Sequence, residues 1–146
     1  MMRKDALQAF PKGDSPLQED SALLGPAPGV VVAVNSEAEY HTALEAAGER
    51  LVLVDCYADW CGPCRAIAPA FKAFADEYRD VVFLKVDVDK APGVSKQLKV
   101  MAMPTFVFVR SGKRVGSVTG ASAARIKVGL DNDGSVSLCG QFCAVQ

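Results

Sequence analysis

Apolar residues in the middle of the chain fall into short runs that are separated by polar stretches with helical spacing. Five runs predict strands, because their length and composition suit segments buried in a sheet. The last two runs are close enough for a serine and a glycine to join them as a tight hairpin. The expected strands are Val30–Val34, Leu51–Val54, Val81–Val88, Thr105–Val109 and Arg114–Val118, with the turn at Ser111–Gly112.

Between the strands, apolar residues recur every three or four positions, which predicts helices. The first helix should begin at a capping box formed by Ser36 and Glu39 and end at Gly48. The second helix contains Pro69, which should kink it, because proline lacks an amide and crowds the preceding turn. The apolar positions are Tyr40, Ala43, Leu44 and Ala47 in the first helix, Ile67, Phe71, Phe74 and Tyr78 in the second, and Val94 and Leu98 in a short third.

This order of elements predicts an α/β fold. Strands that alternate with helices favour right-handed parallel connections, and the final hairpin adds antiparallel strands. We therefore expect a mixed sheet between helices. Residues 1–29, which precede it, are rich in proline and glycine, and we expect them to form a flexible extension.

Composition narrows the class of protein. Half of the 146 residues are hydrophobic, which suits one folded domain with extensions. The formal net charge of -1 gives no electrostatic reason to expect binding to nucleic acid or to a membrane surface. No apolar run is long enough to span a bilayer, and the N-terminus does not resemble a secretory signal or a transit peptide. We therefore expect a cytoplasmic protein in a reducing compartment.

The candidate chemistry lies at Cys61 and Cys64, which flank Gly62 and Pro63 between a buried strand and a helix. Two residues between cysteines at the start of a helix bring the sulfurs close enough to bond across one turn. Free amides and the helix dipole at this end favour a thiolate on the first cysteine. We therefore expect Cys61 to be an exposed nucleophile and Cys64, one turn inward, to be a shielded resolving thiol.

Two other interpretations of the cysteine pair remain open. The chain has 5 cysteines, an odd number, so a complete set of disulfides within it is impossible. A pair with this spacing can supply half of a zinc site, but the other candidate ligands, Cys139, Cys143 and His41, do not form a compelling second pair. The pair can also be structural, although the strand before it and the helix after it match a redox motif better.

A longer segment around the pair resembles a known family. Val54–Cys64, with the letters VDCYADWCGPC, is similar to the active-site segment of thioredoxins. The resemblance covers roughly residues 30–128 and includes the motifs Lys85–Asp89, Met103–Thr105 and Val118–Gly120. It implies the thioredoxin fold, a central mixed sheet of about five strands flanked by about four helices. It also implies the activity of a protein-disulfide reductase, an oxidoreductase that carries electrons.

The resemblance assigns further residues to the site. Asp55 would exchange protons with Cys64, and burial at the strand end should raise its pKa and suit it to that transfer. An exposed or purely structural carboxylate is the alternative. Lys85 resembles the lysine that lies near this aspartate in the family, or it is a strand residue whose amine reaches solvent. The remaining assignments are Trp60, Met103, Pro104 and Gly120 for substrate docking, and Gly62 and Pro63 for the redox potential.

In the family the peptide bond before the residue matching Pro104 is cis, and it faces the cysteine pair. The backbone of Met103 would then pair with an extended target segment, whereas an ordinary proline at a strand start is the alternative. Trp60 is expected to be an exposed contact surface, although tryptophan is more often found in the core. Gly120 is expected to permit close approach of the target, and the alternative is a turn that only ends the strand. Cys56 lies on the strand face opposite Asp55 and should be a small buried hydrophobe.

These assignments predict thiol–disulfide exchange that contributes to cell redox homeostasis. The Cys61 thiolate attacks a target disulfide, and Cys64, assisted by Asp55, resolves the mixed disulfide. The resemblance implies that a thioredoxin reductase supplies electrons from NADPH. The chain itself has no glycine fingerprint for a dinucleotide, and we expect no bound cofactor or metal. Expected partners are the reductase and disulfide-containing proteins such as peroxiredoxins, and the protein is expected to be a monomer.

The resemblance weakens near the C-terminus, where the family has an amphipathic helix. Ser122 can cap such a helix, but Gly129 and the turn-like Asp131–Gly134 should cut it short. We therefore expect a thioredoxin domain at residues 30–130 and a divergent tail at 131–146, which either packs on the domain or is disordered. A disulfide between the two tail cysteines is an alternative to simple apolar filling. The positions involved are Ile126 and Leu130 in the helix, and Leu138, Cys139, Phe142 and Cys143 in the tail.

Two other functions use related chemistry or the same fold. An oxidase or isomerase of the secretory pathway is disfavoured, because neither Gly62 nor Pro63 supplies a cation that would over-stabilise the thiolate. The C-terminus also lacks a retention signal for that pathway. A binding or chaperone module without turnover would not need the complete set of redox residues. Reduction of insulin with dithiothreitol distinguishes these functions.

Overall fold

The computed structural model describes residues 29–135. Residues 1–28 of the expected N-terminal extension lie outside this range. Tail residues 136–146, with Cys139 and Cys143, lie outside it as well. The expectations for these two segments therefore remain predictions.

Strands and helices between residues 29 and 135 follow the predicted order. The structure has five strands and four helices, as the family resemblance implied. In chain order they are β1 (Val31–Val34), α3 (Glu37–Ala47), β2 (Val52–Tyr57), α4 (Gly62–Glu77), β3 (Val82–Asp87), α5 (Pro92–Gln97), β4 (Thr105–Arg110), β5 (Lys113–Thr119) and α6 (Ala123–Asp131).

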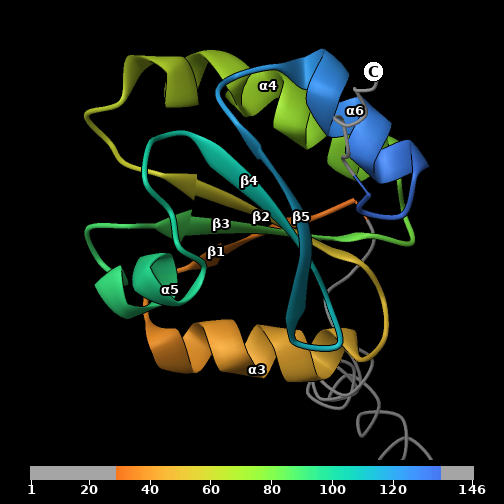
Figure 1. The fold of residues 1–146 in the computed structure, drawn as a ribbon, viewed down its shortest axis with the longest axis horizontal. Coiled ribbons are helices and arrows are strands. Elements are labelled where there is room, and N and C mark those ends of the chain that lie inside the picture. The colour runs from red at the N-terminus through yellow and green to blue at the C-terminus, as the bar shows by residue number, and fades with distance from the viewer. Residues whose placement is uncertain (1–28, 136–146) are drawn as a thin grey trace, which may run out of the picture.

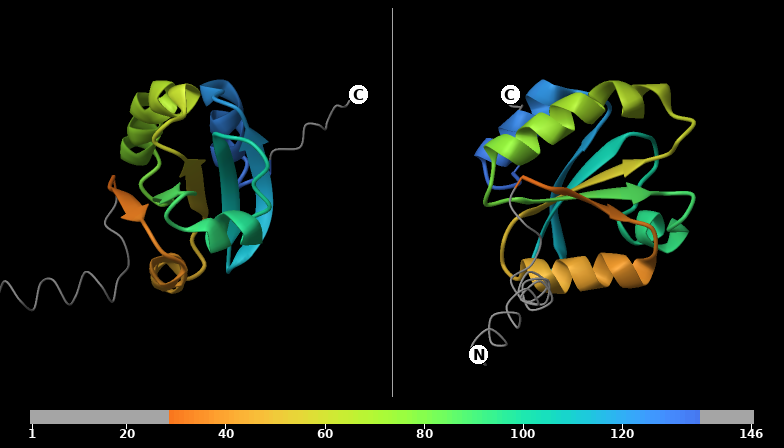
Figure 2. Two further views of the ribbon diagram at one scale, coloured as in Figure 1. Left: turned by 90° about the vertical axis from the view of Figure 1, so that its left-hand side faces the viewer. Right: turned by 180° about the vertical axis from the view of Figure 1, so that it is seen from behind.

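The strands form one mixed sheet in the order β1-β3-β2-β4-β5. β1, β3 and β2 are parallel, whereas β4 is antiparallel to β2, and β5 is antiparallel to β4. Figures 1 and 2 show that α4 and α6 cover one face of the sheet and that α3 and α5 cover the other. The predicted α/β architecture is therefore confirmed.

Strand β2 lies in the centre of the sheet and continues three residues beyond the apolar run that predicted it. Asp55 and Cys56 stay in the strand because β3 pairs with them on one side and β4 on the other. Successive side chains of a strand point to opposite faces. Leu53 lies in the core under α4 and α6, and Cys56 lies in the core under α3 and α5. Asp55, two residues after Leu53, therefore faces α4.

The core under α4 and α6 is built around aromatic rings. The ring centroid of Phe71 from α4 lies 5.3 Å from that of Phe83 and 5.7 Å from that of Phe106. All three side chains are buried, and each such burial contributes about 1.5–3 kcal/mol. This packing fixes α4 over the sheet and so places the start of the helix above the end of β2.

Ser36 caps helix α3, as predicted, and its hydroxyl accepts the amide of Glu39 at 3.1 Å. The second half of the capping box differs from the expectation. The Glu39 carboxylate accepts the amide of Asn35 at 2.7 Å, one residue before the cap. An amide outside the helix also lacks a backbone partner, so the carboxylate satisfies it instead. Gly48 ends the helix with a φ of 62°.

The turn between β4 and β5 is the predicted hairpin turn. Ser111 and Gly112 have φ values of 53° and 78°, so both adopt the left-handed conformation that suits a two-residue hairpin. Ser122 caps helix α6, as predicted, but Gly129 does not cut the helix short. Gly129 is buried within the helix, and the burial of Ile126 and Leu130 outweighs a propensity cost of about 1 kcal/mol. The helix ends after Asp131, where the predicted turn begins.

Candidate active site

Cys61 and Cys64 lie at the start of α4 and are joined by a disulfide, with their Cα atoms 5.3 Å apart. Cys61 is the residue that caps the helix, and its Sγ accepts the amide of Cys64 at 3.2 Å. Pro63 occupies the first turn, where its fixed φ suits a helix and its missing amide costs little. The first cysteine sulfur therefore takes the place that a serine oxygen takes in an ordinary helix cap.

The expected contrast in exposure between the two cysteines is not present in this disulfide form. Cys61 is 5% exposed and Cys64 is 4% exposed. Both pack in a small cluster with Ala58, which Tyr57 and Met103 cover in part. The bond holds both sulfurs in the same apolar layer, so exposure does not separate their roles. The surroundings of the two cysteines do differ, because Cys61 caps the helix and Cys64 lines a cavity.

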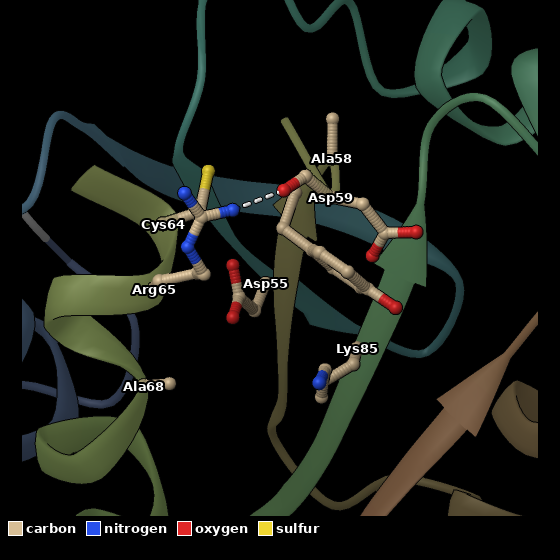
Figure 3. A pocket seen from close by; sticks show the side chains of 8 residues that line it. Asp55, Ala58, Asp59, Cys64, Arg65, Ala68 and Lys85 are labelled. Carbon is tan, nitrogen blue, oxygen red and sulfur yellow. Dashed lines mark hydrogen bonds between the residues drawn. The ribbon is translucent and has the colours of Figure 1, made fainter. Parts of the chain in front are cut away.

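This cavity has a volume of about 140 Å³ and lies between the first turns of α4 and the ends of β2 and β3 (Figure 3). Asp55 and Lys85 line it together with Cys64, so the structure brings these three predicted residues to one place. Arg65 is also part of the wall and donates a hydrogen bond to the carbonyl of Asp59. Tyr57, Ala58, Asp59 and Ala68 complete the lining.

Asp55 is a buried acid with a perturbed pKa. Its residue is 3% exposed, and its side chain points into the space between α4 and Lys85 (Figure 3). Burial raises the pKa of Asp55 from 3.8 to about 7, and the positive charge of Lys85 opposes this rise. Lys85 is its register partner on β3, with the amine 4.6 Å from the centroid of the Tyr57 ring. Oδ1 of Asp55 accepts no hydrogen bond from residues 29–135.

The four residues assigned to docking lie in segments that the sheet brings together. Trp60 is 66% exposed, and its indole donates to the Asp89 carboxylate at 3.0 Å. The bond between Met103 and Pro104 is cis, as the resemblance implied. The amide of Gly120 donates to the carbonyl of Pro104 at 2.8 Å, which ties the end of β5 to this bond.

Comparison with known proteins identifies the family. A family model described as thioredoxin matches residues 31–132.

The chain belongs to the thioredoxin family.

The matches with two named relatives span nearly the whole length of each relative. Thioredoxin-2 of Saccharomyces cerevisiae is 46% identical over 98 residues, which are 67% of this chain and 93% of the relative. Human thioredoxin is 39% identical over 102 residues, or 70% of this chain and 97% of the relative. A thioredoxin f2 solved in complex with ferredoxin:thioredoxin reductase has a TM-score of 0.70 at 32% identity, covering 75% of this chain and 100% of that one. The activity is that of thioredoxins, protein-disulfide oxidoreductases that exchange dithiols and disulfides through such a pair.

Two contacts of this thioredoxin site escaped the sequence analysis. Asp89 lies in the recognised Lys85–Asp89 motif, but nothing in its spacing indicated a bond to Trp60, which is 29 residues away. Arg65 follows the cysteine pair directly, and only the folded loop brings its guanidinium to the carbonyl of Asp59. Both contacts depend on the path of the loop after β2, which apolar periodicity does not describe.

Cys56 was expected to be a small buried hydrophobe of the domain, and the structure confirms this. The residue is fully buried and carries a free thiol. The pKa of this thiol is raised to about 12, mainly by burial and also by the charge of Asp55, while the charge of Arg114 opposes the rise. Cys56 is therefore inert beside the redox pair.

Two other structural findings bear on metal binding and on membranes. Among residues 29–135, no three histidine, cysteine, aspartate or glutamate side chains are grouped so that they could hold a metal ion. Within the same range, no helix has the length and apolar character needed to cross a bilayer.

Proposed function

We propose that the protein reduces disulfides in other proteins, with Cys61 as the nucleophile and Cys64 as the resolving thiol. The observation that carries this assignment is the hydrogen bond from the Cys64 amide to Cys61 Sγ at the start of α4. In the reduced form this amide and the positive end of the helix dipole stabilise a thiolate on Cys61. Cys64, one turn inside, has no equivalent position at the helix end.

The first step forms a mixed disulfide. The Cys61 thiolate attacks one sulfur of the target disulfide, a new bond forms between Cys61 and that sulfur, and the other target sulfur leaves as a thiolate. Gly62 and Pro63 place no cation beside the pair, so the thiolate is not stabilised to the extent that makes an oxidant. These two residues set a potential suited to reduction.

In the second step Asp55 acts as the general base for Cys64. A carboxyl group with a pKa of about 7 is poised to take a proton near neutral pH. The Cys64 thiolate then attacks Cys61, the bond between Cys61 and the target breaks, and the target leaves with the electron pair. Lys85 lies opposite Asp55 in the sheet, and its charge supports the ionised carboxylate.

The target docks around the cysteine pair. The exposed ring of Trp60 offers a flat apolar contact, which the bond to Asp89 holds in place. The backbone of Met103, beside Pro104, pairs with an extended segment of the target in the manner of strand addition. Gly120 has a φ of 101° and no side chain that would obstruct this segment.

Regeneration of the dithiol requires a reductase. The solved complex of thioredoxin f2 with a reductase supports such a partner for this chain. We propose that electrons come from NADPH through a thioredoxin reductase, and that targets include disulfide-containing proteins such as peroxiredoxins. In this proposal the protein acts as a monomeric electron carrier of the cytoplasm and contributes to redox homeostasis.

Turnover and trapping test the assignment together. The parent protein should reduce insulin disulfides with dithiothreitol, and Cys61→Ser should abolish this reduction. Cys64→Ser should accumulate a target adduct through Cys61, because the nucleophile remains and the resolving thiol is gone. An adduct that forms through Cys64 in Cys61→Ser, and none in Cys64→Ser, would reverse the two roles. Full activity of Cys61→Ser would contradict the redox function itself.

A further inference from the structure

The loop between α5 and β4 contains an unbroken run of apolar residues. Val100, Met101, Ala102, Met103 and Pro104 follow one another without a polar side chain. Connecting loops ordinarily carry polar residues, because they lie at the surface. Figures 1 and 2 show this loop beside the connection from β2 to α4, which leads into the cysteine pair. The run therefore places apolar side chains next to the active site.

Packing explains most of this run but not Met101. Val100 is partly buried and packs against the core under α3 and α5. Pro104 is buried, and Met103 packs in part against the cluster that holds the two active-site cysteines. Ala102 is exposed but presents only a methyl group. Met101 is 92% exposed, more than any other exposed large apolar residue between 29 and 135, so its side chain contributes nothing to the core.

The backbone on both sides of Met101 is held in place. The amide of Val100 donates to the carbonyl of Ser95 at 3.0 Å. The hydroxyl of Thr105 donates to the carbonyl of Ala102 at 2.5 Å. A partner that contacts Met101 therefore does not have to order the loop first, which lowers the entropy cost of binding. Single exposed apolar residues are common on protein surfaces, but this one is presented on a fixed loop beside the docking segment.

Met101 lies within reach of a target that docks as proposed. The target segment pairs with the backbone of Met103, whose side chain packs against the cysteine cluster. Two extended residues span at most about 7 Å, so Met101 lies no further than this from Met103 along the backbone. A strand advances about 3.3 Å a residue, and side chains at alternate positions point to the same side. A target side chain about two or three residues from the reactive cysteine therefore comes within reach of Met101.

We propose that Met101 selects targets that carry a large apolar side chain about two or three residues from the reactive cysteine. The proposal rests on the function proposed above and names the class of target. Contact between the two side chains removes apolar surface of both partners from water, which favours the docked complex. Methionine suits this role because its flexible, polarisable thioether adapts to aliphatic and aromatic side chains alike. Met101 is not part of the cluster around the reacting sulfurs, so it affects docking and not the exchange of disulfides.

Two peptide disulfides that differ only in apolar character serve as probes. Each is a dimer of one short peptide, joined through its single cysteine, so that attack on either sulfur gives the same products. The second and third residues on both sides of the cysteine are leucine in one probe and serine in the other. Reduced protein is mixed with excess probe, the reaction is quenched with acid, and the released peptide thiol is measured by chromatography. The maximal rate and the half-saturating concentration are obtained for each probe.

Three variants separate the contact at Met101 from general surface effects. Met101→Gln keeps the length of the side chain but removes its apolar character, whereas Met101→Leu retains that character. Val128→Gln makes a matched change at an exposed apolar residue of α6, outside the loop. Both positions are exposed, so every variant should fold like the parent, which circular dichroism and thermal unfolding will verify.

The half-saturating concentration should report the selection. The parent should reach half-saturation with the leucine probe at a concentration about tenfold lower than with the serine probe, the size expected for one apolar contact. Met101→Gln should reduce this preference to within about twofold and leave the maximal rate within about twofold of the parent, because only docking is affected. Met101→Leu should keep the preference, and Val128→Gln should match the parent.

Several results would overturn the proposal. It fails if the parent reaches half-saturation at the same concentration of both probes, although reduction of both would leave the proposed function standing. It also fails if Met101→Gln keeps the preference, or if Val128→Gln loses it to the same extent. Loss of the preference in Met101→Leu would show that the target does not recognise apolar character. A lower maximal rate with unchanged half-saturation would place Met101 in the chemistry and not in docking. A parent that reduces neither probe would refute the proposed function, and the selection with it.

Discussion

Replacing Asp55 with asparagine should stabilise the folded protein at neutral and alkaline pH but not at acidic pH. The wild-type carboxyl group has a pKa of about 7 in the folded state, because burial disfavours its charged form. In the unfolded chain it returns to its ordinary value of 3.8. Between these two values the folded state holds a proton that the unfolded state has lost. Stability therefore falls as the pH rises from about 4 to about 7.

The size of this effect follows from the two pKa values. Each pH unit between 3.8 and about 7 corresponds to about 1.4 kcal/mol, so the full penalty is about 4 kcal/mol above pH 7. Asparagine has nearly the same shape as the protonated carboxyl group and never ionises. The variant should therefore gain about 4 kcal/mol over the parent at high pH and nearly nothing at about pH 4.

Urea unfolding of both proteins at about pH 4 and about pH 8.5 measures the effect. The disulfide form should be used, because Cys61 and Cys64 do not titrate in it. Asp80→Asn removes an exposed aspartate and serves as the control, with no comparable difference between the two pH values. A gain for Asp55→Asn that is equal at both pH values would refute the reasoning, since it would then owe nothing to ionisation.

Three other features of the structure give simple expectations. Cys56 should resist alkylation by iodoacetamide at about pH 8 until the protein unfolds, because its thiol is buried with a pKa of about 12; rapid labelling of the folded protein, read by peptide mapping, would contradict this. Gly134→Ala should cost about 3 kcal/mol of unfolding free energy and Gly112→Ala about 1 kcal/mol. Both glycines have positive φ, but only at Gly134 would a Cβ meet Val115, at 2.8 Å, so equal costs in urea unfolding would refute the contact. Trp60, the single tryptophan, should be accessible to acrylamide quenching; emission that acrylamide does not quench would exclude an exposed ring.

Much of the fold could be predicted from the spacing of apolar residues, because each helix or strand buries side chains at a spacing set by its own geometry. The order of strands and helices, the serine caps and the hairpin turn all follow from local residue chemistry. The ends of elements were less predictable. β2 runs on through Asp55 because two neighbouring strands pair with it, and α6 continues past Gly129 because Ile126 and Leu130 are buried on the same helix. Tertiary contacts decide these ends, and local composition does not report them.

The site was predicted in part from the residues and in part from the family. The spacing of Cys61 and Cys64 before a helix indicated a redox pair directly. The proximity of Lys85 to Asp55 depends on the register between β2 and β3, which only the resemblance could indicate. Equal burial of the two cysteines was not foreseen, because it arises from the disulfide and the layer packed around it.

The most direct test of the account is the redox state of the peptide that contains Cys61 and Cys64. The folded protein is equilibrated in a series of glutathione or dithiothreitol buffers, its free thiols are alkylated, and the peptide is analysed by mass spectrometry. The account predicts that the peptide carries no label under oxidising conditions and two labels under reducing conditions, in a single two-electron transition. A pair that keeps one state across all mild buffers, or that takes up a single label, would contradict dithiol–disulfide exchange by this protein.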